Sequence, residues 1–198
     1  MIKKWEAALI AGLICTIILS IASFSADCKS IREDVFRVHI LANSDSEEDQ
    51  ALKLKVRDEL QIYCLDMFKE CESSYEAQAL AQSSLDAIQT QVQNTVYENG
   101  YDYCVSVEVA KEYFSTRDYE DITLPAGQYK ALVVKLGKAQ GKNWWCCLYP
   151  TVCINAAAEN SPSDVLDSSE LEIVENKPKY EIRFFIVELF ESIKKHFK

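Results

Sequence analysis

An uncharged stretch near the start of the chain constrains it most. Residues 7–25, AALIAGLICTIILSIASFS, carry no charge over 19 positions and follow Lys3 and Lys4. As a helix this stretch would reach about 28 Å, close to the thickness of the hydrocarbon core of a bilayer. A buried core helix is excluded because the stretch has no polar face to meet water. Basic residues before it and an acidic chain after it predict that the rest of the protein is exported.

Residues 1–25 are therefore predicted to be a signal peptide or an N-terminal membrane anchor. Ser23-Phe24-Ser25 before Ala26 offers small residues for a cleavage site, but the apolar stretch is longer than most signal peptides have. Both outcomes stay open from the sequence: the exported part is either secreted or tethered by an uncleaved helix.

Charge and composition limit the classes of partner. The chain has 198 residues, with 21 Lys and Arg against 31 Asp and Glu, for a net charge of -10. Without residues 1–25, whose net charge is +1, the remainder stands at -11. This balance argues against a nucleic-acid partner. A hydrophobic content of 48% with only 5 Gly and 4 Pro excludes a disordered chain.

Hydrophobic periodicity predicts the elements of one exported domain over residues 33–155. Residues 35–41 alternate as a strand, and the polar run that follows supplies caps for an amphipathic helix through residue 67. A second helix is predicted over 75–97, ended by Asn99-Gly100. Further strands are predicted at 103–109, 119–124 and 128–136, the last two joined as a hairpin by Pro125-Ala126-Gly127. The order predicts an α+β fold: a mainly antiparallel sheet with two long amphipathic helices after the first strand, preceded by an N-terminal hydrophobic leader helix.

The C-terminal part changes in composition. Residues 156–179 are rich in acids and serines and are predicted to be an acidic linker. Tyr180, Ile182, Phe184 and Ile186 then alternate like a strand, before helical spacing takes over. Residues 180–198 are therefore predicted to be a strand and short helix that return to the domain. The alternative is that this basic, aromatic end lies on a membrane surface or a partner helix.

The common catalytic motifs are absent from the sequence. Only two histidines occur, which excludes an HExxH metal site, and neither a GxSxG elbow nor a DTG or DSG loop is present. The sequence GKAQGKN at 137–143 resembles a phosphate loop, but its glycines are one residue too close together and Asn143 replaces the required Ser or Thr. It is predicted to be a flexible loop. No cofactor and no metal are predicted.

The cysteines are the remaining chemical constellation. Cys64 and Cys71, seven positions apart, would be about 10.5 Å apart along one helix and could not bond to each other while that helix persists. A turn at Pro150 could bring Cys146 and Cys153 to bonding distance. Seven cysteines follow the leader, so at least one is free or intermolecular. Two alternatives stay open: zinc bound by Cys146, Cys147 and Cys153, and an exported thiol-dependent hydrolase with Cys146 as nucleophile and His39 as base.

Trp144 and Trp145 stand beside these cysteines. Two adjacent indoles do not easily enter one core, so one is expected at a surface, where tryptophan often anchors an interface. The alternative is that both are half-buried under the neighbouring loop.

Three blocks of sequence resemble one family. The first is FRVHILANSDSEEDQALKLKVRD at 36–58; the second runs from LPAG at 124–127 to NWWCCLYPTVC at 143–153; the third is EIRFFIVE at 181–188. Together they are similar to the stage II sporulation protein R family of endospore-forming bacteria. Ala139 departs from that family's pattern, since it interrupts the usual run of glycines.

The resemblance implies a signalling protein and not an enzyme. Members are made in the forespore, exported across the forespore membrane into the intermembrane space, and activate the membrane-embedded aspartic protease stage II sporulation protein GA, so that pro-sigma-E is processed in the mother cell. No nucleic acid and no small-molecule substrate is expected. The residues expected to contact the protease are Arg37, His39, Asn43, Asp45, Trp144 and Trp145. For Asn43 and Asp45 the alternative is helix capping.

Overall fold

The structure is a computed structural model that describes residues 3–119, 122–150 and 162–196. The chain divides into two compact units, which are described separately. Unit 1 contains Met1–Ile31, Ser115–Gly127 and Ser168–Lys198, and unit 2 contains Arg32–Phe114 and Gln128–Asp167.

A mixed four-stranded sheet forms the centre of unit 2. Its strands are β1 (Phe36–Leu41), β2 (Val105–Phe114), β5 (Gly127–Leu136) and β6 (Asn143–Tyr149), in the order β2-β5-β1-β6. Strand β1 pairs in parallel with β5 and antiparallel with β6. The predicted α+β class is confirmed, and the sheet is mixed because the most buried strand, β1, has one parallel neighbour.

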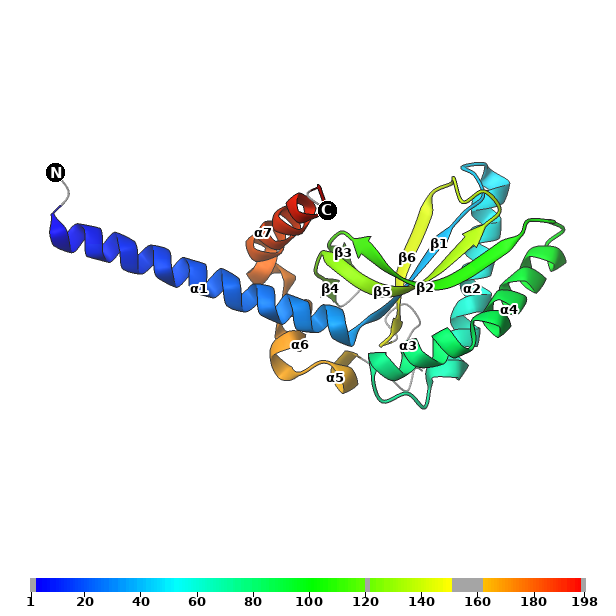
Figure 1. Ribbon diagram of the computed structural model, residues 1–198, viewed down its shortest axis with the longest axis horizontal. Helices are drawn as coiled ribbons and strands as arrows, with labels where there is room; N and C mark the ends of the chain where they lie inside the picture. The colour runs from blue at the N-terminus through cyan, green and yellow to red at the C-terminus, as the bar shows by residue number, and fades with distance from the viewer. Residues whose placement is uncertain (1–2, 120–121, 151–161, 197–198) are drawn as a thin grey trace. The chain divides into compact units, whose positions relative to one another are not determined.

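Three helices pack on this sheet and form the core with it (Figure 1). They are α2 (Glu47–Phe68), α3 (Ser74–Ser83) and α4 (Leu85–Glu98). The buried stripe of α2 contains Leu52, Val56 and Leu60, at the spacing of four residues that places side chains on one face. The second predicted helix is thus interrupted at Ser84, between α3 and α4, and Gly100 with φ 83 ends it as expected.

One prediction about strands is wrong, and one strand had no prediction. The expected hairpin around residues 125–127 does not form: β4 (Thr123–Leu124) pairs with β3 (Arg117–Asp118) in a separate two-stranded sheet, while β5 belongs to the four-stranded sheet. In addition, the sequence predicts no element over residues 144–149, where β6 lies. Its residues Cys146, Cys147 and Tyr149 are all buried, so it lacks the alternation of apolar and polar residues that indicates a strand.

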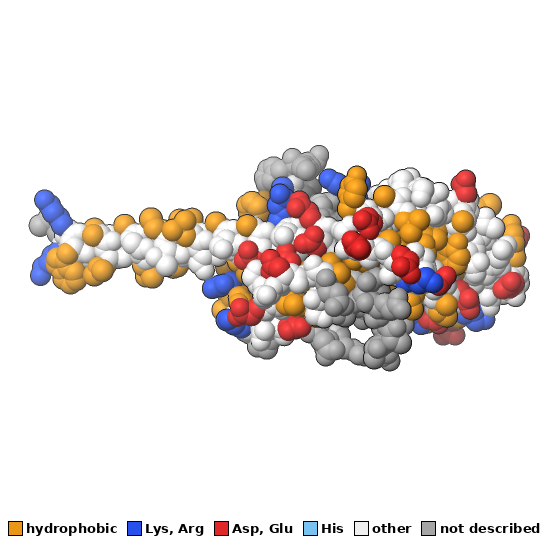
Figure 2. Space-filling model, turned by 90° about the horizontal axis from the view of Figure 1, so that it is seen from below, with side chains coloured by type: hydrophobic (Ala, Val, Ile, Leu, Met, Phe, Trp, Pro, Cys, Tyr) orange, Lys and Arg blue, Asp and Glu red, His pale blue; other side chains and the backbone are white. Residues whose placement is uncertain are grey.

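Unit 1 contains the N-terminal helix α1 (Lys4–Asp34) up to residue 31. This helix is long and apolar enough to cross a membrane, and its first half exposes large apolar side chains such as Leu13 and Leu19. Figure 2 shows hydrophobic side chains along the exposed part of this helix and basic side chains near its N-terminal end. Farther along, Phe24 is 2% exposed and packs against Tyr180 and Phe184, with ring centroids 5.5 and 5.3 Å away.

The C-terminal segment is helical where a linker and a strand were predicted. Beyond the short α5 (Pro162–Val165), α6 (Ser168–Glu175) lies within the predicted linker and buries Ile173 and Val174. The predicted strand at 180–186 is part of α7 (Lys177–His196). Apolar residues occupy two sides of this helix, and this double pattern imitates the alternation of a strand. The functional division into residues 1–25, 33–155, 156–179 and 180–198 stays a prediction.

Candidate functional site

The polar motif after β1 holds a second loop, residues 137–142. The Asn43 side chain accepts a hydrogen bond from the backbone N–H of Lys138 at 3.0 Å, and its Nδ2 donates to Asp49 at 2.8 Å. The backbone carbonyl of Asn43 accepts from the N–H of Gln140 at 3.2 Å. Asn43 therefore joins the end of β1, the start of α2 and the loop between β5 and β6.

Asp45 forms a hydrogen bond with the other end of the same loop. Its Oδ1 accepts from the backbone N–H of Lys142 at 2.6 Å, and the carbonyl oxygen of Lys142 accepts from Lys53 Nζ at 3.0 Å. The buried ammonium of Lys53 also donates to Gln50 at 2.6 Å. These hydrogen bonds hold residues 137–142 in one conformation, whereas the sequence predicts a flexible loop there.

Neither Asn43 nor Asp45 is the cap of the helix. The N-cap of α2 is Ser46, whose hydroxyl accepts from the Asp49 N–H at 3.2 Å. The helix-capping alternative is therefore wrong: both side chains accept hydrogen bonds from the backbone of the loop at residues 137–142, and not from the first turn of α2. Burial works to raise the pKa of Asp49, but hydrogen bonds from Ser44 and Asn43 outweigh it and hold that pKa below its usual range.

Two glycines allow this loop to approach so closely. A Cβ on Gly141 would lie 2.1 Å from the backbone oxygen of Ser44, and one on Gly137 would lie 2.4 Å from Asn43 Oδ1. Gly137 also has a left-handed backbone, with φ 56. Ala139 shares that conformation with φ 51, although it has a Cβ. The structure thus shows why glycine is favoured at the place where this sequence carries Ala139.

Arg37 lies beneath the sheet surface, fully buried. Its guanidinium carbon is 4.0 Å from the centroid of Phe114 and 4.9 Å from that of Tyr129, and Nε donates to the Cys146 carbonyl at 3.3 Å. The two aromatic rings and the hydrogen bond to the Cys146 carbonyl compensate for the loss of water around the buried guanidinium. A direct contact between Arg37 and a partner would require this packing to open.

His39 is 7% exposed and lies on the same face of the sheet as Arg37. Its ring centroid is 4.9 Å from that of Trp145, and Nδ1 is 4.0 Å from a carboxylate oxygen of Glu112. Burial lowers the pKa of His39, while Asn143 and Glu112 partly oppose the shift. The imidazole is therefore neutral at pH 7.

The two tryptophans lie on opposite faces of β6, an edge strand of the sheet. Trp145 pairs with His39 across the strands, whereas Trp144 pairs with Ile40 and has the Arg57 guanidinium 5.6 Å from its ring centroid. Both indoles are half-buried, which supports the second alternative of the sequence, although strand alternation and not a covering loop separates them.

The same register separates Cys146 from His39. Cys146 pairs with Val38, so its side chain belongs to the face opposite that of His39. A thiolate and imidazole pair is therefore not assembled. Cys147 faces the other way, and burial raises the pKa of its thiol to about 12, with Arg37 opposing. Cys153 lies outside the described residues, so the Cys146–Cys153 bond stays a prediction.

Some residues of this region had no signal in the sequence. Asp49 and Lys53 read as ordinary charged positions of an amphipathic helix, yet both are buried in the network that holds residues 137–142. Phe114 and Tyr129 stack on Arg37 from distant strands. Within the described residues, no group of His, Cys, Asp and Glu is placed to hold a metal ion.

Comparison with known proteins relates the sequence of this chain to one family. Residues 32–159 match the family model for stage II sporulation protein R. The chain is 37% identical over 123 residues to stage II sporulation protein R of Bacillus subtilis (strain 168), which covers 62% of this chain and 55% of the relative. The chain thus spans about half the length of the curated relative it matches. No solved structure matches it. Because the family model covers well over half of the residues, as the sequence motifs predicted, this chain belongs to the stage II sporulation protein R family.

Proposed function

We propose that this chain is an exported sporulation signal that activates the membrane-embedded aspartic protease stage II sporulation protein GA, so that pro-sigma-E is processed in the mother cell. The observation that carries the proposal is membership of the stage II sporulation protein R family over residues 32–159, which include the whole described sheet. The apolar helix α1 supports export across the forespore membrane into the intermembrane space, with the protein secreted or tethered there.

The network around residues 137–142 supports a ligand with a fixed recognition surface. Asn43 and Asp45 set the position of this loop, and the loop leads directly into β6 with Trp144 and Trp145. A pre-organised surface binds with a smaller entropic cost than one that orders on contact. We assign the contact with the protease to the end of β6 and its loop, while Arg37 and His39 support that surface from within the sheet.

Reconstitution tests the proposed activity. The full chain is co-expressed with the protease and a pro-sigma-E reporter, and export of the chain is measured beside processing of the reporter. Processing that depends on the chain is expected. An exported, folded chain that gives no processing would refute the proposal.

Variants of the edge strand test the contact surface. Trp145→Ala and Trp144→Ala are expected to reduce processing and co-purification with the protease. Tyr97→Ala, which removes an exposed aromatic ring from α4, is the matched control and should leave both unchanged. Cys146→Ser separates signalling from thiol chemistry, since normal processing by this variant would exclude a hydrolase that uses Cys146.

A further inference from the structure

The C-terminal helix α7 has two apolar faces. Tyr180, Phe184 and Val187 form the first face and are buried, the two rings against Phe24 of α1. The second face is exposed, and it comprises Ile182 (76% exposed), Phe185 (66%), Leu189 (52%), Phe190 (60%) and Ile193 (49%). A helix with one face packed on protein and the other face in water carries polar residues on the outer face. The exposed face of α7 named above is apolar instead.

The spacing of these residues makes the exposed face continuous. At about 100° per residue, Ile182, Phe185, Leu189 and Ile193 fall in one sector, opposite the buried set. The charged side chains of Glu181, Glu188 and Lys194 fall outside that sector. The exposed face therefore offers an apolar stripe along three turns.

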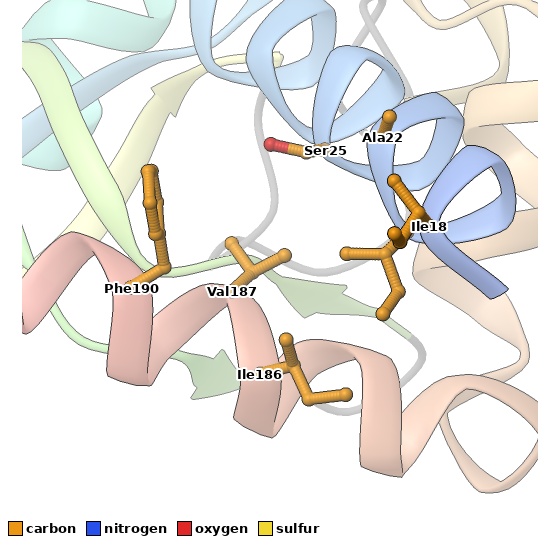
Figure 3. A pocket seen from close by; sticks show the side chains of 7 residues that line it. Ile18, Ala22, Ser25, Ile186, Val187 and Phe190 are labelled. Carbon is orange, nitrogen blue, oxygen red and sulfur yellow. The ribbon is translucent and has the colours of Figure 1, made fainter. Parts of the chain in front are cut away.

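An apolar groove lies between α1 and α7. Its cavity has a volume of about 310 Å³. Ile18, Ile21, Ala22 and Ser25 line it from α1, and the side chains of Ile186, Val187 and Phe190 face them from α7 (Figure 3). Apart from the hydroxyl of Ser25, the lining side chains are hydrocarbon. A water-filled groove of this composition is unfavourable, whereas an acyl chain matches it.

The lining residues place this groove beside the apolar stretch of α1. Phe24 contacts the beginning of α7, while Ile18, about 9 Å closer to the N-terminus along α1, lines the groove with Phe190. Helix α7 thus crosses α1 beside the C-terminal end of the apolar stretch. Ile18, Ile21, Ala22 and Ser25 all belong to residues 7–25, so the part of α7 from Ile186 to Phe190 lies beside the end of that apolar stretch.

We propose that α7 is an interfacial membrane helix, with its exposed apolar face in the boundary between headgroups and acyl chains and with a lipid acyl chain in the groove against α1. The bilayer is the occupant that α1 itself brings to this position. The groove opens beside the apolar stretch of α1 and the exposed face lies on the outer side of the same helix α7, so lipid that surrounds α7 covers both. Helices with such an apolar face bind at this depth in proportion to the apolar area they bury.

Photolabelling from the lipid tests the assignment. The full chain is reconstituted in vesicles of phosphatidylethanolamine and phosphatidylglycerol that contain a phospholipid with a diazirine at the end of one acyl chain. After irradiation, mass spectrometry locates the adducts. We expect adducts on residues 186–193 as well as on residues 7–25.

Substitution identifies the surface responsible. The double variant Leu189→Asp and Phe190→Asp should lose the adducts on α7 and keep those on α1, which serve as the internal control for insertion. Ile62→Asp makes the same type of change at an exposed apolar position of α2 (64% exposed) and should change neither set.

The unsubstituted chain can itself overturn the proposal. Adducts confined to residues 7–25 would show that lipid does not reach α7 and would overturn the proposal. No protease is present in this experiment, so its outcome is independent of the proposed signalling activity.

Discussion

Replacing Asn43 by alanine tests the hydrogen bonds that join β1, α2 and the loop at residues 137–142. The change removes the acceptor for the N–H of Lys138 and the donor to the carboxylate of Asp49. The first bond is between neutral groups and contributes about 1 kcal/mol, and the second, to a charged group, contributes about 1.5–3 kcal/mol. We expect Asn43→Ala to lower the free energy of unfolding by about 3 kcal/mol.

The assay is urea unfolding of the full chain in detergent, followed by tryptophan fluorescence in a Trp5→Phe background. Trp144 and Trp145 then report on β6, which follows the loop directly. The midpoint should fall at unchanged slope, and the melting temperature should fall by about 6–12 °C. A double-mutant cycle with Asp49→Ala isolates the energy of the bond between the two side chains.

Asn94→Ala is the control, because Asn94 is exposed on α4. There the same substitution should be neutral or slightly stabilising, since alanine has the higher helix propensity. If Asn43→Ala unfolds at the same urea concentration as Asn94→Ala, or if the coupling to Asp49 is zero, the reasoning about this network is refuted.

Other predictions concern single side chains. Gly141→Ala should prevent the loop from closing, because its Cβ would lie 2.1 Å from a backbone oxygen, and should lower the melting temperature. Ala139→Gly should stabilise the protein by roughly 0.5–1 kcal/mol in urea unfolding, because it relieves a left-handed alanine. Burial lowers the pKa of His39, so the unfolded chain takes up a proton at a higher pH than the folded chain does. The free energy of unfolding should therefore fall as the pH drops below about 6.5. His39→Gln should weaken this pH dependence, as measured by urea titrations at several pH values. Burial raises the pKa of Cys64 to about 12, so alkylation of the native protein, read by mass spectrometry, should label exposed Cys104 and spare Cys64.

Each of these has a clear contrary outcome. A Gly141→Ala variant with the original melting temperature would contradict the close approach, and an Ala139→Gly variant of lower stability would contradict the strain argument. A pH dependence that survives in His39→Gln would assign it to other groups. Equal labelling of Cys64 and Cys104 would show that the helix opens readily.

The sequence predicted elements whose signals are local. Strand β1 and helix α2 were found within one or two residues, because Val38 and Ile40 alternate with polar residues and because Ser46 and the acids after it mark the start of a helix. By contrast, α7 was misread. The apolar residues Ile182 and Ile186, outside its buried face, completed a false alternation with Tyr180 and Phe184.

Contacts between distant segments had no local signal. The parallel pairing of β1 with β5 joins residues 36–41 to 130–135, and the role of Asn43 depends on a loop 95 positions later in the chain. Asn43 looked like a cap because asparagine is common at that place before a helix. Its true partners appear only once β5 and β6 are placed beside β1. The sequence correctly indicated that the Asn43 side chain accepts a hydrogen bond from a backbone N–H, but not that this N–H belongs to Lys138.

The position of Phe24 connects the predicted cleavage site with the packing of α7. Ser23 and Ser25, the small residues of the predicted cleavage site, flank Phe24 within the continuous helix α1, and the Phe24 ring packs against Tyr180 and Phe184. Cutting there would take away an aromatic side chain on which α7 packs, at a cost of about 3–5 kcal/mol if it resembles the loss of a buried phenylalanine. Cleavage at this site and the packing of α7 thus depend on the same turn of α1.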